Sequence, residues 1–356
     1  MIIGTCGFCS TGSSAVSDYL KEFDENQVLD GFEFTIPYLP DGLEDLEYNL
    51  TSHICRDDCS SIAIPRFRRF MQKYAAHLNR LYSLPPEKLD EITERFINKL
   101  VQFKWHSLRR SDVLLYPTKF YNFFAWRIMR GKVIPWLNKR KGHCVDIYPY
   151  RDIEVSINPS NFESAAKEFL RAILDGMGAD FSKNIVLDQP FIGEDPVRSF
   201  HFFENPKAII VDRDPRDNYL FTKKMLYKYS NIMPVDTVQN FVTYYKLLRE
   251  GRPYKTPNKD VLCMHFEEMV YDYDNATAKI REFCELGENP HPLSIFDPKI
   301  SMSNTQLYLR YPEYADDIKY IEDNLPDYLF DFSPYPKPDI KGKMFQGRSP
   351  LNKSSK

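Results

Sequence analysis

Short apolar runs that alternate with segments of helical periodicity are the feature that most constrains the fold of this chain. Apolar strands that alternate with helices are typical of a mainly parallel sheet that is covered by helices on both faces. The sequence therefore predicts an α/β fold, with a mainly parallel sheet flanked by helices. The expected strands are residues 1–6, 27–34, 184–188, 207–212 and 260–266.

The segment between the second and third of these strands has a different composition. Residues from about 57 to 140 have helical periodicity with no convincing strand, and they combine basic with aromatic side chains. We interpret this segment as a helical insertion, at about residues 55–143, in a single α/β domain that spans residues 1–333. The remaining tail, residues 334–356, is rich in Pro, Lys and Ser and is expected to be loosely ordered.

Charge and hydropathy exclude several classes of protein. With 47 basic and 50 acidic residues the net charge is −3, which argues against a general nucleic-acid binder. No apolar stretch reaches the roughly 18 residues of a transmembrane helix. The first residues lack the basic start and apolar segment of a secretory signal, so we expect a cytoplasmic protein. The seven cysteines, an odd number, do not indicate a disulfide framework.

The loop after the first strand has the composition of an anion-binding loop. It contains Ser10, Thr11, Gly12, Ser13 and Ser14, and helical periodicity begins directly after it. Backbone N–H groups at such a strand–loop–helix junction converge on a phosphate, and the helix dipole adds to them. The alternative is a plain glycine turn that opens a helix.

Two other functions can be considered for the same loop. The spacing from Gly7 to Gly12 is that of a P-loop, but Ser13 stands where a P-loop has its lysine, which weakens the interpretation as an ATP- or GTP-using enzyme. Cys6 and Cys9 form a CxxC pair, which could be a redox pair or, with Cys55 and Cys59, a zinc site. Only five residues precede Cys6, which disfavours a redox pair of the thioredoxin type.

A charged turn after the strand at residues 207–212 is the most specific motif in the chain. The turn reads Asp-Arg-Asp-Pro-Arg-Asp over residues 212–217 and leads into a helix. At the carboxyl edge of a parallel sheet such a turn lies at the ligand crevice, and Arg213 is suited to bind a phosphate with two parallel hydrogen bonds. The alternative is a solvated charged turn.

Together, the loop at residues 10–14 and the charged turn resemble those of the sulfotransferases, which use 3′-phosphoadenosine 5′-phosphosulfate as the donor. The similarity covers residues 1–35 and 180–290, including His265–Val270, and it implies a P-loop-like three-layer α/β fold. It also implies that the loop cradles the 5′-phosphosulfate and that Arg213 binds the 3′-phosphate. A bacterial, carbohydrate-type member of the family is the closest match in character.

The chain departs from the family pattern at two positions. Ser10 replaces the usual lysine or arginine, and Phe221 replaces a serine that binds the 3′-phosphate, so the adjacent Thr222 becomes the candidate for that contact. A hydrogen bond to a charged group contributes about 1.5–3 kcal/mol, so losing both would weaken the site unless they are replaced. Candidates for the replacement cation lie in the basic segment: Arg66, Arg68, Arg69, Arg130 and Lys132.

The resemblance implies transfer to a hydroxyl or amine with a general base and without a metal. Glu33, about twenty residues past the loop, is the candidate base, and His53, His106 and His201 are rival candidates. The expected acceptor is a saccharide or a lipid-linked sugar. Two alternatives stay open: a P-loop-type nucleotide or sugar kinase, for which residues 185–188 resemble a Walker-B strand, and a non-catalytic nucleotide-binding relative.

Overall fold

A computed structural model describes the chain except for residues 57, 108–127, 142–150, 227–231, 342–343 and 345–356. The chain divides into two compact units. The first unit comprises Met1–Leu39, Ala76–Pro85 and Leu170–Lys356, and the second comprises Pro40–Ala75 and Pro86–Phe169. Among the described residues, no helix has both the length and the apolar character that crossing a bilayer requires.

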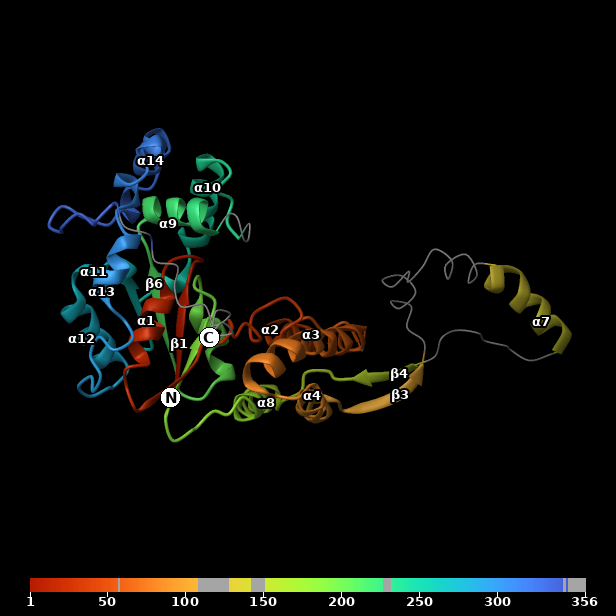
Figure 1. Cartoon of the computed structure of the whole chain (residues 1–356). Coiled ribbons are helices and arrows are strands. Elements are labelled where there is room, and N and C mark those ends of the chain that lie inside the picture. The colour runs from red at the N-terminus through yellow and green to blue at the C-terminus, as the bar shows by residue number, and fades with distance from the viewer. Residues whose placement is uncertain (57, 108–127, 142–150, 227–231, 342–343, 345–356) are drawn as a thin grey trace. The chain divides into compact units, whose positions relative to one another are not determined.

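The first unit is built on a five-stranded sheet in which all neighbouring strands are parallel. The strand order is β2-β5-β1-β6-β7, so the N-terminal strand lies in the middle (Figure 1). The structure therefore confirms the predicted α/β class with a mainly parallel sheet flanked by helices. The strands are β1 (Ile2–Gly7), β2 (Asn26–Leu29), β5 (Asn184–Asp188), β6 (Pro206–Asp212) and β7 (Val261–His265).

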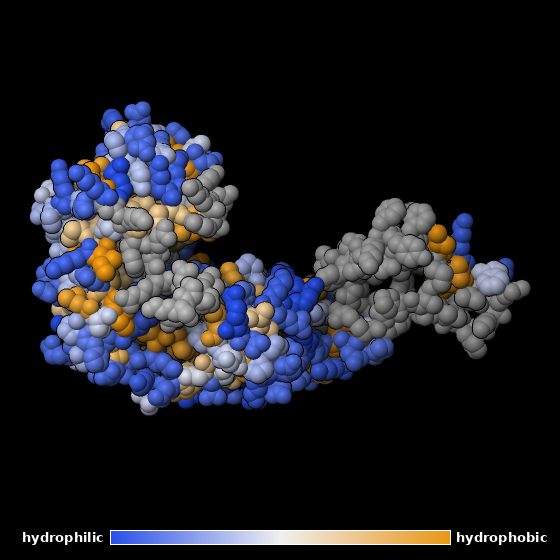
Figure 2. All heavy atoms as spheres, in the orientation of Figure 1, coloured by the Kyte–Doolittle hydropathy of each residue, from blue (hydrophilic) through white to orange (hydrophobic). Residues whose placement is uncertain are grey.

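The helices of this unit connect successive strands or follow the last one. Helix α1 follows β1, α9 and α10 follow β6, and α11 and α12 follow β7. Their bounds are α1 (Ser13–Leu20), α9 (Pro215–Phe221), α10 (Val238–Arg249), α11 (Phe266–Tyr271), α12 (Tyr273–Phe283), α13 (Pro298–Ser301) and α14 (Ala315–Asn324). On the face of the molecule that Figure 2 shows, the side chains around α14 are mostly hydrophilic.

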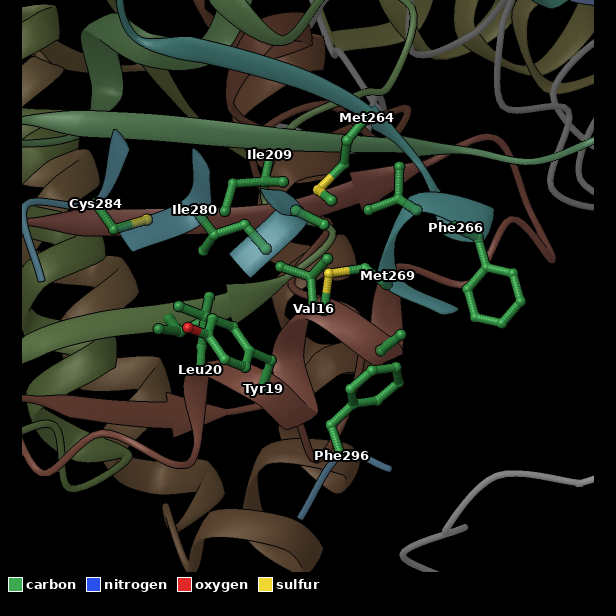
Figure 3. Close-up of a cluster of buried hydrophobic side chains, with 14 of the residues drawn as sticks. Val16, Tyr19, Leu20, Ile209, Met264, Phe266, Met269, Ile280, Cys284 and Phe296 are labelled. Carbon is green, nitrogen blue, oxygen red and sulfur yellow. The ribbon is translucent and has the colours of Figure 1, made fainter. Parts of the chain in front are cut away.

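Helices α1, α11 and α12 pack against one face of the sheet. Figure 3 shows the resulting core, in which Val16 and Leu20 of α1 meet Ile209 of β6 and Met264 of β7. Burial of each such side chain contributes roughly 1.5–3 kcal/mol. A separate core joins α9, α10 and α14 and contains Tyr219, Leu220, Phe241, Tyr245, Ile318 and Ile321.

The second unit is mostly helical. It contains α2 (Leu43–Glu47), α4 (Pro86–Leu100) and α7 (Ile134–Lys141), and it shares the long helices α3 (Asp58–Tyr82) and α8 (Phe162–Gly176) with the first unit. Stacked and edge-on rings of Phe67, Phe96, Phe162 and Phe169 form its core. Pro85 lies between α3 and α4, and Pro86 is the first residue of α4.

Two details of the expected secondary structure were wrong. Residues 57–140 contain a strand, β3 (Phe103–Ser107), which pairs antiparallel with β4 (Arg151–Val155). Its partner is distant in the sequence, so local periodicity gave no sign of it. The second strand of the main sheet ends at Leu29 rather than at Phe34, because Asp30 forms an ion pair with Lys21 and the Gly31 N–H donates to the Tyr82 hydroxyl.

Gly4 lies in β1, in the middle of the sheet, and is tightly packed. A Cβ atom at this position would lie 2.5 Å from Cδ2 of the buried Phe191 ring. We therefore expect Gly4→Ala to lower the free energy of unfolding by about 1–3 kcal/mol, measured by urea denaturation. Gly287→Ala is the matched control, since no atom lies within 4 Å of the added Cβ. Equal stability of the two variants would contradict this packing.

Candidate functional site

The loop after β1 lies at the point where the sheet connections diverge. From β1 the chain continues to β2 at one edge of the sheet, whereas from β6, the neighbour of β1, it continues to β7 at the other edge. In open α/β sheets ligands bind at the carboxyl ends of the strands at such a point. The residues between Gly7 and Ser13 are therefore the place where this fold favours a site.

The loop backbone is held in a conformation that few sequences adopt. Cys9 and Ser10 have φ values of 71° and 56°, and Gly12 has a φ of 89° directly before α1. A non-glycine residue in this left-handed region costs of order 1–3 kcal/mol, so the surrounding structure must hold it there. At Gly12 a side chain is also excluded by space, because a Cβ would lie 2.6 Å from the Phe266 ring.

The loop presents a run of backbone donors. In the part of the chain that the structure describes, the N–H groups of residues 10–14 donate to no protein acceptor. The Thr11 hydroxyl is not the acceptor for these N–H groups; it accepts a hydrogen bond from the Phe8 N–H at 3.2 Å. Successive free N–H groups before a helix N-terminus form an anion-binding concavity. The assignment of Ser10, Thr11, Gly12, Ser13 and Ser14 to an anion stays a prediction.

Gln189 joins the end of β5 to both ends of this loop. Its side-chain oxygen accepts from the Gly7 N–H at 3.2 Å, and its amide nitrogen donates to the Ser13 hydroxyl at 3.1 Å. Gln189 itself has a φ of 51°. The sequence analysis missed this residue, because a polar residue after a strand gives no local sign that it reaches a loop far away in the sequence.

Arg213 is brought to the loop, but its side chain is buried. Only 2% of the residue is exposed, and its guanidinium donates to the carbonyl oxygens of Ser10, at 3.1 Å, and of Asn304. It also lies over the rings of Phe221 and Phe266. Burial lowers the pKa of this guanidinium, and the nearby carboxyl groups partly oppose that effect. Of its nitrogens, Nε has no partner in the described structure.

The acidic residues of the charged turn also have protein partners. Asp212 forms a bidentate ion pair with the buried Arg249. Asp214 caps α9 and pairs with Arg216 at 2.7 Å. Asp217 accepts hydrogen bonds from the backbone N–H groups of residues 306 and 307, each at 2.7 Å. The charged turn, which the sequence analysis predicted to lie at a ligand crevice, thus connects several segments of the chain.

Thr222, the candidate for a second 3′-phosphate contact, has its hydroxyl engaged inside the protein. It is 1% exposed, and its hydroxyl donates to the sulfur of Met233, which belongs to the core of α9, α10 and α14.

Glu33 and Asp188 lie near each other at the carboxyl edge of the sheet. The Phe34 N–H donates to the Asp188 carbonyl oxygen at 2.7 Å, which fixes the segment that carries the exposed Glu33. Burial, followed by the charges of Glu33 and Asp30, raises the pKa of Asp188 to about 7. Burial raises the pKa of the Cys9 thiol most, a hydrogen bond with Ser10 lowers it, and the charge of Glu33 raises it further. Because Phe34 bonds to Asp188, and the adjacent Gln189 bonds to both ends of the loop, Glu33 lies close to the loop.

The rival bases and most candidate cations have contacts of their own. His53 stacks on Tyr48, His106 pairs with Asp152, and the ring of His201 lies 3.9 Å from that of Phe202. Three cations of the second unit have local partners. Arg66 pairs with Asp41, Arg68 pairs with Glu94 and Glu154, and Arg69 donates to the Pro65 carbonyl oxygen. Lys132 is exposed. The Arg130 side chain lies outside the described residues, as do Arg109, Arg110, Trp126 and Arg127.

The cysteines near the loop are free thiols. Cys6 is buried, and burial raises the pKa of its thiol well above the usual range, which disfavours a thiolate. Among the described residues, no three His, Cys, Asp or Glu side chains are grouped as metal ligands.

Comparisons with known proteins give weak similarity in structure and none in sequence. No family model matches the chain, and no curated protein sequence matches it. A sulfotransferase domain from the curacin biosynthetic pathway is similar over 83% of this chain and 77% of that chain, with a TM-score of 0.34 and 11% identity. An identity and a TM-score this low leave the function to be argued from the residues of the site.

The raised pKa of Asp188 predicts how stability depends on pH. The native carboxyl keeps its proton up to about pH 7, whereas in the unfolded chain it ionises near 3.8. Between these values rising pH favours the unfolded wild-type chain, by at most about 1.4 kcal/mol per pH unit. Asp188→Asn lacks this penalty, so its stability relative to wild type should rise between about pH 4 and pH 7 and stay constant above. Urea denaturation across this range measures the difference, and a pH-independent difference would contradict the assignment.

Proposed function

We propose that this chain is a sulfotransferase that uses 3′-phosphoadenosine 5′-phosphosulfate as the donor and a hydroxyl or amine as the acceptor. The observation that carries the proposal is the run of free N–H groups at residues 10–14, directly before α1 and at the divergence point of the sheet. Such a loop is complementary to an anion with several oxygens, as a phosphosulfate is. The sequence resemblance to the sulfotransferases rests on the same residues.

The residues present fit a phosphosulfate in a specific way. Ser10, Thr11, Gly12, Ser13 and Ser14 would hold it through backbone N–H groups and the positive end of α1. Arg213 would add a positive charge next to the loop, but Nη1 and Nη2 already donate to carbonyl groups, and Nε is the nitrogen without a described partner. We assign no donor contact to Thr222, since its hydroxyl faces Met233.

The proposed reaction is an in-line transfer of the sulfuryl group. The acceptor oxygen or nitrogen forms a bond to sulfur while the bond from sulfur to the phosphate oxygen breaks, and the acceptor proton passes to a base. Glu33 is the proposed base, because it is exposed and lies close to the loop. Backbone N–H groups that face the donor stabilise the charge that develops on the departing phosphate.

A saccharide is the proposed class of acceptor. Sugar hydroxyls supply the nucleophile, and aromatic rings commonly pack against sugar faces. The second unit carries exposed rings of this kind on β3, where Phe103 is 56% and Trp105 is 45% exposed, with Lys104 between them. Exposed rings of this kind are the observation that supports a saccharide as the acceptor.

A kinase is the second candidate, and one observation favours it. Asp188 ends β5, the strand next to β1, which is where a P-loop kinase holds an acidic residue. Against this, Ser13 stands at the lysine position, and its hydroxyl is engaged by Gln189. The terminal phosphates of ATP would meet no lysine there.

Ligand binding should separate these candidates. We expect 3′-phosphoadenosine 5′-phosphate to raise the melting temperature, because a ligand that binds only the native state stabilises it by about 2.7 kcal/mol at a hundredfold excess over Kd. ATP with Mg²⁺ should have a smaller effect in the same thermal-shift assay. Stabilisation by ATP with Mg²⁺ alone would replace the sulfotransferase proposal with the kinase. Binding without transfer to any acceptor would support a non-catalytic relative.

The role of Glu33 can be tested separately from binding. Glu33→Gln should lower the rate of transfer from labelled donor to a glycan panel by about 10²–10⁴-fold, because general-base catalysis contributes that much. Its affinity for 3′-phosphoadenosine 5′-phosphate should stay within about twofold of wild type. Glu288→Gln, at another exposed glutamate, is the control. Unchanged turnover in Glu33→Gln would remove Glu33 as the base.

A further inference from the structure

Two buried side chains of the charged turn and of α9 bind the carbonyl groups of the anion loop. Nδ2 of Asn218 donates to the carbonyl oxygen of Cys9 at 3.0 Å, and Nη1 of Arg213 donates to that of Ser10 at 3.1 Å. Asn218 is 0% and Arg213 is 2% exposed, so water does not compete for these contacts. Two successive carbonyl groups of the loop are therefore fixed on the side of β6 and α9.

The direction of these carbonyl groups determines the direction of the neighbouring N–H groups. The described peptide bonds are all trans, and in a trans peptide the C=O and the following N–H point in opposite directions. Because the carbonyls of Cys9 and Ser10 face α9, the N–H groups of Ser10 and Thr11 point away from it. These are among the N–H groups without a protein acceptor.

The same contacts explain how a strained loop persists. Cys9 and Ser10 both have positive φ values, a conformation that is unfavourable for residues with a side chain. The loop is also fixed at its start, where the guanidinium of the buried Arg249 lies 4.2 Å from the centre of the Phe8 ring. Without the two carbonyl contacts, the peptide groups at residues 9–11 could rotate and turn oxygen atoms toward an anion.

We propose that Asn218 and Arg213 are positioning residues that orient the loop for anion binding. They withdraw the carbonyls of Cys9 and Ser10 so that only N–H groups face the ligand. This inference rests on the proposed function in one respect, the assignment of the loop as the anion site. It gives Arg213 a role that differs from clamping a phosphate, and it adds Asn218, which is uncharged and acts on the anion through the loop backbone.

Three observations indicate that the segment from Arg213 to Asn218 is held rigidly. Asp214 caps α9, and Pro215 occupies its first turn, so the segment between Arg213 and Asn218 is fixed. The Asp214 N–H donates to the buried Glu267 carboxyl at 3.1 Å. Asn218 Oδ1 has no described partner, so the amide has one contact, the one to the loop.

The experiment uses Asn218→Leu, which has a similar volume and no donor. The probes are inorganic pyrophosphate and 3′-phosphoadenosine 5′-phosphate, titrated by calorimetry into the full-length protein. We expect Asn218→Leu to weaken binding of both probes at least tenfold. Tyr219→Phe is the matched control, since it removes hydrogen bonds of α9, to Asp317 and from Lys223, without a described contact to the loop. Its affinities should stay within twofold of wild type.

Arg213 variants provide a second measurement that does not depend on Asn218→Leu being folded. Arg213→Lys keeps the charge and one donor, so it should keep most of the pyrophosphate affinity, whereas Arg213→Met should lose it. Thermal unfolding of each variant establishes that it is folded. Unchanged pyrophosphate affinity in folded Asn218→Leu, or in folded Arg213→Met, would overturn the inference.

The outcomes for the inference and for the proposed function are distinguishable. If wild type binds pyrophosphate, Asn218→Leu loses it, and 3′-phosphoadenosine 5′-phosphate binds no tighter than pyrophosphate, the positioning role stands and the donor assignment fails. If both probes bind and the variants behave as expected, both proposals are supported. If wild type binds neither probe at millimolar concentration, the loop is no anion site and both are overturned.

Discussion

The buried charged turn at residues 212–217 is the constraint on which the first unit of this structure depends. Its charged side chains lie almost entirely inside the protein, where an unpaired charge costs several kcal/mol. Each is therefore joined to another segment: Asp212 to α10, Arg213 to the loop after β1, and Asp217 to the backbone at residues 306–307. One turn at the end of β6 thus fixes the loop, α10 and the C-terminal segment together.

The contacts of the charged turn also hold the strained loop after β1 in the conformation on which the proposed anion binding depends. A loop of small residues is free to adopt many conformations in an isolated chain, and positive φ values at Cys9 and Ser10 are unfavourable. Buried donors on one side of the loop and Gln189 on the other restrict it to one conformation. In that conformation the loop exposes donors rather than acceptors, so the anion affinity that we propose for it would be a consequence of packing at β6 as much as of its own composition.

The sequence predicted the features that local patterns determine, and missed those that depend on distant partners. Apolar runs located β5 and β6 closely, and the small-residue loop was predicted to precede a helix, as it does in α1. The alternating charges predicted a site at residues 212–217, but only the fold shows which of these charged side chains form internal ion pairs. The strand β3, the contacts of Gln189 and the raised pKa of Asp188 all depend on residues far apart in the chain.

The use of backbone donors in place of a loop lysine has a consequence for chemistry at this site. Backbone N–H groups carry no ionisable proton in the physiological range, and the guanidinium next to them is Arg213, which keeps its charge through that range. The capacity of the loop to bind an anion should therefore change little with pH. Among the backbone N–H groups, Arg213 and the carboxyl groups of the crevice, a pH dependence would come from the acidic side, where Asp188, whose pKa is about 7, lies next to Glu33. In the proposed function, anion binding and proton transfer would thus belong to chemically separate groups at one edge of the sheet.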